Sequence, residues 1–197
     1  MEHITVCICT YKRPWLLGRL LHELRDQKTE DLFTYSVVVA DNDQAASAKA
    51  AVHSFATGCD IKVIYCVEPT PNIALARNKV VQEAKGDYLA FIDDDEIPGN
   101  DWLLVMLRTL KALGVDGVLA PVLPYFEAEA PKWLVKAGFY DRPRHKTGFV
   151  LGWQEARTGN VLLRRGILDG IEQAPGAIAG LYRGENLGKR LIRLTED

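Results

Sequence analysis

Short apolar runs alternate with helically spaced apolar residues over roughly the first 120 positions of the chain. Runs rich in β-branched residues predict buried strands at residues 4–9, 35–40, 61–67 and 88–92. Between them, apolar residues recurring every three or four positions predict helices at about residues 14–24, 45–56, 72–85 and 101–113. This alternation predicts an α/β fold with a mostly parallel central sheet and helices on both faces.

Glycine, proline and asparagine mark the ends of these segments. Pro14 suits the first turn of the first helix, and Asn72 can cap the third. Gly58 and Gly86 end the second and third helices. The boundaries therefore have local chemical causes as well as a hydrophobic pattern.

The pattern changes near residue 120. Beyond it the chain is rich in Trp, Gly, Pro and Arg, and one further strand is predicted at residues 159–163. A length of 197 residues fits one domain better than two. We therefore expect a single domain over 1–197, with a strand–helix half at 1–120 and a second half at 121–197.

The composition is that of an ordinary globular domain, with 48% hydrophobic and 25% charged residues. No apolar run approaches the roughly 20 residues of a membrane-spanning helix, and the first residues lack the pattern of a signal peptide. The default expectation is a cytoplasmic protein. The 4 cysteines show no Cys-x-x-Cys spacing, so neither a disulfide framework nor a zinc site is expected.

Charge is unevenly distributed although the net charge is only −2. Residues 1–100 hold 10 basic and 15 acidic side chains, whereas residues 132–193 hold 12 basic and 5 acidic. The asymmetry fits two surfaces with different partners, and it fits random surface scatter equally well. An acidic first half disfavours nucleic acid as a partner.

Asp93, Asp94 and Asp95 directly follow the strand at 88–92. Carboxylates this close repel one another unless a cation is present. Oxygen ligands suit Mg²⁺ or Mn²⁺, and ligands of parallel sheets bind beyond the carboxyl ends of the strands. The cluster therefore predicts a metal site. The alternative is a solvated acidic turn that caps the helix at 101–113.

Asp41 ends another predicted strand, and Arg77 lies near the start of the helix before the acidic cluster. A carboxylate that accepts hydrogen bonds from a base or ribose, with an arginine nearby, suits a nucleotide. Two alternatives remain open. Asp41 is equally able to cap the following helix, and Arg77 to be a solvated helix residue.

Four segments, taken in order and spacing, resemble family 2 glycosyltransferases of the GT-A fold. They are residues 4–14 (ITVCICTYKRP), 37–42 (VVVADN), 76–78 (ARN) and 86–95 (GDYLAFIDDD). The resemblance covers about residues 4–165. Within the family, the chain is most similar to bacterial exopolysaccharide glucosyltransferases of the succinoglycan type.

The resemblance implies a nucleotide-sugar site in the first half of the chain. Thr10, Tyr11 and Arg13 would form the first nucleotide loop. Asp41 would recognise the base, usually uracil, and Arg77 would lie close to the base or the phosphates. The implied donor is a nucleoside-diphosphate sugar.

The resemblance also assigns the acidic cluster. Asp93 and Asp94 would meet the ribose and the metal shell, and Asp95 would bind Mg²⁺ or Mn²⁺ directly. The chain departs from the family at residues 43–44, which are Asp-Gln where relatives more often have Gly-Ser. The base-side loop is therefore expected to differ.

The catalytic base is the largest departure. The family inverts the anomeric centre by direct displacement, and relatives use the aspartate of a Gly-Glu-Asp segment as the base. Here that segment ends in Asn186, and an amide cannot take a proton. Glu185 is our candidate base. The open alternatives are a shifted alignment with another acid as base, an impaired enzyme, or a Glu185 that only favours the start of a helix.

The second half carries the expected acceptor side. Trp133, Trp153 and Asn160 resemble acceptor segments of the family, since aromatic faces suit sugar rings and an amide can bind a hydroxyl. Both tryptophans are equally compatible with a core role. The basic excess favours an anionic acceptor, a glycan or polyprenyl-diphosphate-linked sugar, with peripheral contact to the inner membrane face. Relatives commonly continue beyond the base segment, so this half is expected to be shortened.

Two rival functions compete with sugar transfer. A phosphatase of the haloacid dehalogenase type would use Asp93 and Asp95, but it needs a later acidic pair that the sequence does not offer after residue 96. A non-catalytic nucleotide-sugar-binding domain would explain Asn186. Inverting transfer from a UDP-sugar in polysaccharide biosynthesis is the preferred prediction.

Overall fold

The computed structural model describes residues 1–126, 128–140, 145–151 and 157–167. Its elements, in chain order, are β1 (Glu2–Thr10), α1 (Pro14–Leu24), β2 (Phe33–Asp41), α2 (Lys49–Thr57), β3 (Lys62–Val67), α3 (Ile73–Glu83), β4 (Tyr88–Asp93), α4 (Trp102–Leu113), β5 (Gly117–Leu119), α5 (Lys132–Ala137), β6 (Val161–Arg164) and the 3₁₀ turn η1 (Arg165–Ile167).

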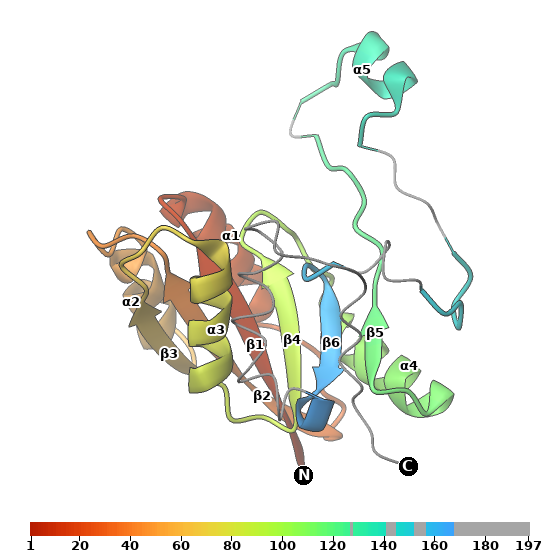
Figure 1. The fold of residues 1–197 in the computed structure, drawn as a ribbon, viewed down its shortest axis with the longest axis horizontal. Coiled ribbons are helices and arrows are strands. Elements are labelled where there is room, and N and C mark those ends of the chain that lie inside the picture. The colour runs from red at the N-terminus through yellow and green to blue at the C-terminus, as the bar shows by residue number, and fades with distance from the viewer. Residues whose placement is uncertain (127, 141–144, 152–156, 168–197) are drawn as a thin grey trace, which may run out of the picture.

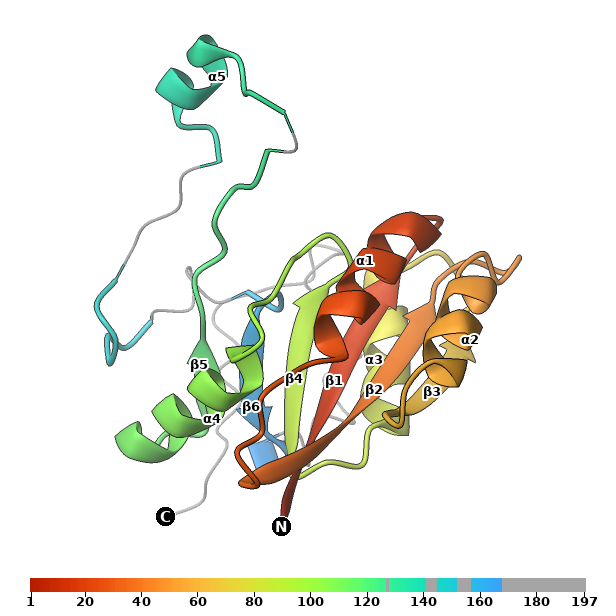
Figure 2. The same ribbon diagram turned by 180° about the vertical axis from the view of Figure 1, so that it is seen from behind.

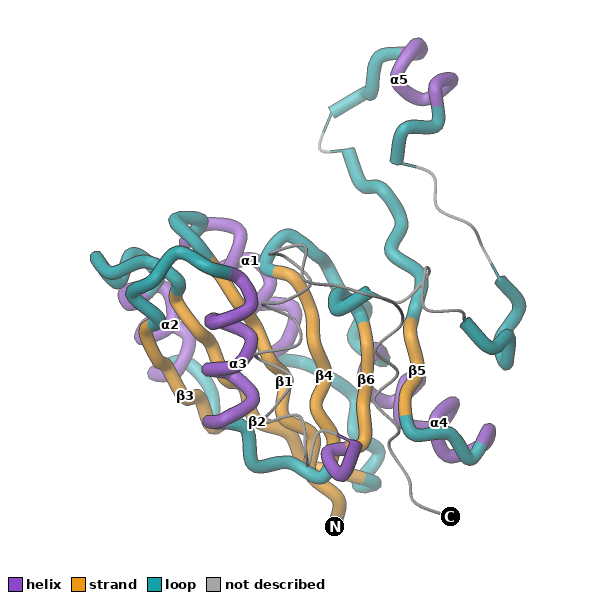
Figure 3. The backbone as a smooth tube through the Cα atoms, viewed as in Figure 1, coloured by secondary structure: helices purple, strands orange, loops and turns teal. Residues whose placement is uncertain are grey.

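The strands form one six-stranded sheet in the order β3-β2-β1-β4-β6-β5 (Figure 3). The pairings of β1 with β2 and β4, and of β2 with β3, are parallel. Strand β6 runs antiparallel to both β4 and β5. The predicted mostly parallel sheet is confirmed, and both antiparallel pairings involve β6, the strand that comes from the second half of the chain.

Helices cover both faces of the sheet, as predicted. Helices α1, α2 and α4 lie on one face and α3 lies on the other (Figures 1 and 2). The strands are therefore apolar on both sides: Ile4, Val6 and Ile8 of β1 join the α1 and α4 core, whereas Cys7 joins the α3 core. Each fully buried Leu or Ile contributes about 1.5–3 kcal/mol by leaving water.

Helix α2 begins later than the predicted residue 45. The backbone N–H of Ala46 donates to the carbonyl of Asp43 in a turn, and Ala46 has a positive φ of 54°. The N–H of Ala48 donates to the carboxylate of Asp41 at 2.7 Å. Side-chain and turn hydrogen bonds thus replace the first helical turn, and the helix starts at Lys49.

The other helix boundaries follow the predicted signals closely. The side chain of Asn72 accepts from the N–H of Ala74 at 2.9 Å and caps α3. Gly114 ends α4 in the left-handed conformation, with φ 62°. Gly86 allows a close approach to β1, because a Cβ there would lie 2.7 Å from the carbonyl oxygen of His3.

An extended segment stands away from the sheet between β5 and β6. We call its described residues from 121 to 151 the arm (Figure 1). It contains α5, a helix that the sequence did not predict. Across the described ranges, no helix is long and apolar enough to cross a membrane. The exposed large hydrophobic residues of the arm are Leu123, Tyr125, Phe126, Trp133, Val135, Phe139, Tyr140, Phe149 and Val150.

Candidate functional site

The candidate site lies where parallel strands end. The register places Thr10 of β1 opposite Asp41 of β2, and Cys9 of β1 opposite Asp93 of β4. The loops that follow these three strands therefore meet at one edge of the sheet. This is the place where open α/β sheets bind ligands.

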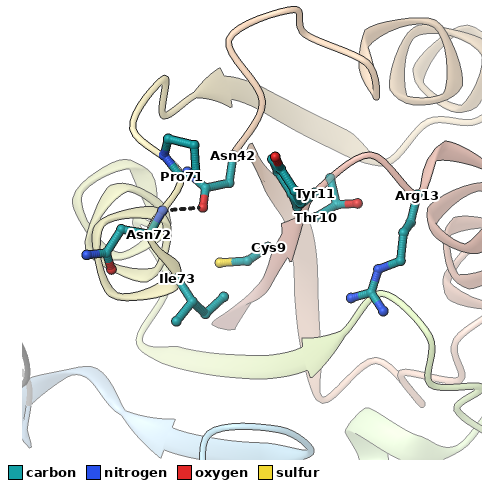
Figure 4. A pocket seen from close by; sticks show the side chains of 8 residues that line it. All are labelled: Cys9, Thr10, Tyr11, Arg13, Asn42, Pro71, Asn72 and Ile73. Carbon is teal, nitrogen blue, oxygen red and sulfur yellow. Dashed lines mark hydrogen bonds between the residues drawn. The ribbon is translucent and has the colours of Figure 1, made fainter. Parts of the chain in front are cut away.

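A cavity of about 290 Å³ opens at this edge (Figure 4). Its volume is near the lower end of the range for small-molecule sites, roughly 300–1,000 Å³. The structure brings three predicted residues, Thr10, Tyr11 and Arg13, to its wall. The full lining is Cys9, Thr10, Tyr11, Arg13, Asn42, Pro71, Asn72 and Ile73.

Asn42 holds one wall of the cavity in place. Its amide Nδ2 donates to the carbonyls of Glu68 at 2.9 Å and Thr70 at 2.6 Å. Its Oδ1 accepts from the N–H of Asn72 at 2.9 Å (Figure 4). The side chain is buried, so these three bonds satisfy it fully. One residue at the end of β2 thereby fixes the loop from β3 to α3.

Asp41 precedes the lining residue Asn42 in the chain but does not itself line the cavity. Its carboxylate is fully buried and accepts from the N–H of Ala48, the hydroxyl of Tyr65 at 2.8 Å and the N–H of Asp43 at 3.2 Å. Burial and the hydrogen bond to Asp41 raise the pKa of the Tyr65 hydroxyl. The geometry is that of the capping alternative for Asp41, and contact with a nucleobase stays a prediction.

Asp94 is the buried member of the acidic cluster. Its Oδ2 accepts from the hydroxyl of Thr10 at 2.7 Å, and its Oδ1 lies 2.6 Å from Nη2 of Arg13. The Arg13 contact is an ion pair without hydrogen-bond alignment, so Oδ1 has no hydrogen-bond donor in the described structure. Burial raises the pKa of Asp94, while Thr10 and Arg13 oppose that rise.

Asp93 and Asp95 are both about half exposed. Nη2 of Arg77 lies 3.4 Å from Oδ1 of Asp93, and Nη1 of Arg13 donates to Oδ2 of Asp95 at 3.2 Å. The structure thus brings Arg77 of α3 to the acidic cluster, while its predicted contact with a base or with phosphates stays a prediction. Two arginines, Arg13 just before α1 and Arg77 within α3, balance much of the negative charge.

Glu96 lies behind the cluster. Its Oε2 accepts from the backbone N–H of Asp93 at 3.3 Å, and burial raises its pKa to about 7. Gly159, just before β6, packs against both acids: a Cβ there would lie 2.7 Å from Oδ2 of Asp93 and 3.4 Å from Oε1 of Glu96. A side chain at residue 159 would therefore require Asp93 to move.

The residues fit a divalent cation that is shared with a phosphate ligand. Among the described residues, no group of three His, Cys, Asp or Glu side chains is placed to hold a metal by itself. Mg²⁺ usually takes one or two carboxylates together with waters and substrate phosphates. Asp95 is exposed beside the cavity-lining Arg13, and Oδ1 of Asp94 lacks a hydrogen-bond donor. Asp95 and Asp94 are therefore the residues that would hold the cation.

The predicted acceptor residues divide into three cases. The Oδ1 of Asn160 accepts from the indole Nε1 of Trp102 at 2.7 Å, and its Nδ2 donates to the carbonyl of Pro121 at 3.0 Å. Its amide therefore joins α4 to the end of β5. Trp133 lies on α5 and is 65% exposed, so it is not a core residue. Trp153 and Glu185 lie outside the described residues.

Several site residues were missed in the sequence. Asn42 stood within a motif, but its clamping of a distant loop depends on contacts 26–30 residues away. Pro71 and Asn72 gave only a loop and cap signal. Gly159 gave no signal of its proximity to Asp93, because β6 joins β4 from the far half of the chain.

Sequence and structure comparisons agree with this geometry. The family model described as "Glycosyl transferase family 2" matches residues 5–172, so the chain belongs to glycosyl transferase family 2. The succinoglycan biosynthesis protein ExoM of Rhizobium meliloti (strain 1021) is 37% identical over 166 residues, covering 83% of this chain and 52% of ExoM. The chain thus spans about half the length of this relative.

Solved structures share the fold at low sequence identity. TarS of S. aureus (residues 1–349), solved in complex with UDP, superposes with a TM-score of 0.63 at 18% identity, covering 87% of this chain and 49% of that one. The mannosyltransferase PcManGT of Pyrobaculum calidifontis, solved with GDP-Man and Mn²⁺, gives a TM-score of 0.63 at 19% identity, covering 86% and 46%. The GT-A fold is confirmed.

Proposed function

We propose that this chain is the donor-binding part of a metal-dependent, inverting glycosyltransferase in exopolysaccharide biosynthesis. The observation that carries the proposal is the cavity at the carboxyl edge of the sheet, whose wall residue Arg13 also contacts Asp94 and Asp95. A nucleoside in the cavity would place its phosphates toward these acids. The relationship to ExoM supports the biosynthetic role.

The donor is proposed to be a UDP-sugar. A complex with UDP exists for TarS and one with GDP-Man and Mn²⁺ for PcManGT, so both nucleotides are precedents on this fold. Pro71 and Ile73 give the cavity apolar walls, and Tyr11 supplies an aromatic face. These are groups that pack against a flat base and ribose.

In the proposed reaction, the acceptor oxygen forms a bond to the anomeric carbon as the bond to the diphosphate oxygen breaks. The diphosphate leaves with the electron pair, and the acceptor proton passes to a base. A divalent cation on Asp95 would neutralise the leaving charge. Thr10 fixes Asp94 beside it, and Arg77 fixes Asp93. This is electrostatic stabilisation by groups that the fold holds in position.

Glu185 is proposed as the base. Glu185→Gln should reduce transfer by at least about a hundredfold while leaving nucleotide affinity within about twofold, because general-base catalysis typically contributes that much. The matched control is Glu172→Gln, a change of the same kind elsewhere in the second half. Full transfer by Glu185→Gln would remove Glu185 from the mechanism.

The acceptor is proposed to be a glycan or polyprenyl-diphosphate-linked sugar at the cytoplasmic face of the membrane. The arm combines its exposed aromatic residues with the exposed Lys132, Lys136 and Lys146, and Glu129 is the only acid among its described residues. Apolar rings beside lysines suit an anionic lipid surface.

Vesicle sedimentation tests the membrane contact. Binding to phosphatidylglycerol vesicles should exceed binding to phosphatidylcholine vesicles and fall with salt. Trp133→Ala should weaken it, whereas Trp15→Ala, at an exposed tryptophan of α1, should not. Equal binding to both lipids, or none, would contradict the proposal.

The donor proposal is tested by calorimetry with UDP-, GDP- and dTDP-sugars, each with and without Mn²⁺. We expect UDP-sugars to bind more tightly than GDP- or dTDP-sugars. They should reach full affinity only when Mn²⁺ is present. Asp95→Asn should abolish the metal dependence, and Asp101→Asn, at an exposed acid beyond the cluster, should preserve it. If no nucleotide binds, the proposal fails.

A non-catalytic nucleotide-sugar-binding domain is the second candidate. Asn186, at the position where relatives carry the base, is the observation that favours it. Slow hydrolysis of a UDP-sugar with Mn²⁺, lost in Asp95→Asn, would exclude this candidate. Tight binding with neither hydrolysis nor transfer to any acceptor would support it.

A further inference from the structure

The side chain of Arg13 contacts two carboxylates of the acidic cluster, Asp94 and Asp95. Its guanidinium lies 2.6 Å from Oδ1 of Asp94 and donates to Asp95 at 3.2 Å, and the same side chain lines the cavity. Figure 4 shows Arg13 on the opposite side of the cavity from Asn72 and Ile73. Arg13 therefore occupies the carboxylates that the proposed function assigns to a divalent cation.

We propose that Arg13 is an internal counter-ion, which occupies the acidic cluster in the free protein and turns to the diphosphate when a divalent cation takes its place. The inference rests on the proposed function and deepens it. It makes metal and nucleotide binding depend on each other through one side chain. The cation alone would leave the Arg13 guanidinium without an anionic partner, and the diphosphate alone would leave Asp94 and Asp95 without a cation.

The local structure leaves Arg13 free to move. Its side chain is 46% exposed, and although Arg13 is the N-cap residue of α1, the side chain makes no capping hydrogen bond. Only its backbone carbonyl serves the helix, by accepting from Leu17. The guanidinium can therefore leave Asp94 and Asp95 without disturbing α1.

The charge balance supplies the reason for the exchange. Asp94 is buried with its Oδ1 lacking a hydrogen-bond donor, so it needs a positive neighbour at all times. An arginine and a divalent cation at the same two carboxylates would repel each other. A diphosphate in the cavity gives the displaced guanidinium a bidentate partner, which it binds well.

Arg77 does not play the same part. Among the described residues its one ion pair is with Asp93, at 3.4 Å; it is less exposed than Arg13, and it does not line the cavity. The exchange is therefore specific to Arg13.

The test measures Mn²⁺ affinity by the electron paramagnetic resonance signal of the free ion, with and without UDP. Arg13→Gln should bind Mn²⁺ roughly fivefold to tenfold more tightly than the native protein when UDP is absent, since a competing cation has been removed. With UDP present this gain should disappear. Arg13→Lys keeps the positive charge but loses the planar guanidinium that donates two parallel hydrogen bonds. Its Mn²⁺ affinity should fall between those of the native protein and Arg13→Gln.

Arg25→Gln is the matched control, because Arg25 also pairs with an exposed acid, Asp26 at 3.5 Å, but lies away from the cluster. This substitution should leave the Mn²⁺ affinity unchanged both with and without UDP. Thermal unfolding gives a second readout: Mn²⁺ should raise the melting temperature of Arg13→Gln more than that of the native protein.

Unchanged or weaker Mn²⁺ binding by Arg13→Gln would overturn the inference. If the native protein still bound Mn²⁺ and UDP, the proposed function would stand and only the counter-ion role would fail. If neither protein bound Mn²⁺, both would fail together.

Discussion

The hydroxyl of Thr10 donates a 2.7 Å hydrogen bond to Oδ2 of Asp94, although the two residues are 84 positions apart. Thr10 ends β1, Asp94 directly follows β4, and the two strands pair in parallel. The bond joins the end of β1 to the acidic cluster. Together with the contacts of Arg13 to Asp94 and Asp95, it couples the two sides of the site.

Thr10→Val should therefore destabilise the protein and weaken metal binding together. The valine keeps the shape but leaves a buried carboxylate oxygen without its donor, which costs about 1–3 kcal/mol. Urea unfolding and Mn²⁺ titration measure the two effects. Thr10→Ser, which keeps the hydroxyl, is the control. A stable Thr10→Val protein with native Mn²⁺ affinity would show that the bond is dispensable.

Gly159→Ala should impair the site more than the fold. The new Cβ would lie 2.7 Å from Oδ2 of Asp93, the end of a half-exposed side chain that can rotate away. We expect a loss of stability below about 1 kcal/mol but about a tenfold loss of affinity for nucleotide with Mn²⁺, because Asp93 leaves Arg77.

Gly166→Ala is the control for that change, since a Cβ at position 166 meets nothing within 4 Å. Calorimetry compares the two variants. Native affinity in Gly159→Ala would mean that the position of Asp93 does not matter for binding.

Asn42→Asp should loosen the cavity wall. The aspartate can still accept from Asn72, but it loses both donors to the carbonyls of Glu68 and Thr70 and places a charge against them. We expect a loss of about 1–3 kcal/mol in the free energy of unfolding and weaker nucleotide binding. Asn100→Asp, at an exposed asparagine, should behave as native. Faster amide hydrogen exchange at Thr70 and Asn72 would locate the effect.

Cys9 should be nearly inert although it lines the cavity. Burial raises the pKa of its thiol to about 12, so only about one molecule in ten thousand is a thiolate at pH 8. Labelling by iodoacetamide, followed by mass spectrometry, should be very slow at pH 8 and rise with pH up to about 12. Cys9→Ser identifies the labelled site. Rapid labelling at pH 7 would contradict the burial of this thiol.

The sequence determined the strand–helix order and the end of the sheet that carries the site. Apolar strands buried on both faces, with helices of regular spacing between them, leave few arrangements other than a parallel sheet covered on both sides. Because parallel strands end at the same edge, the positions of Asp41 and Asp93 at strand ends predicted a ligand site at that edge. The family motifs added the expected partners.

Only the tertiary structure decided what each side chain does at that edge. It buried Asp41 against the hydroxyl of Tyr65 and made Asn42 the residue that holds one wall of the cavity. It also joined Asn160 to Trp102 by a hydrogen bond. It also brought Gly159 from the far half of the chain against Asp93. Local patterns cannot carry this information, because burial and hydrogen-bond partners depend on contacts between residues that are distant in the sequence and become neighbours only when the sheet is assembled.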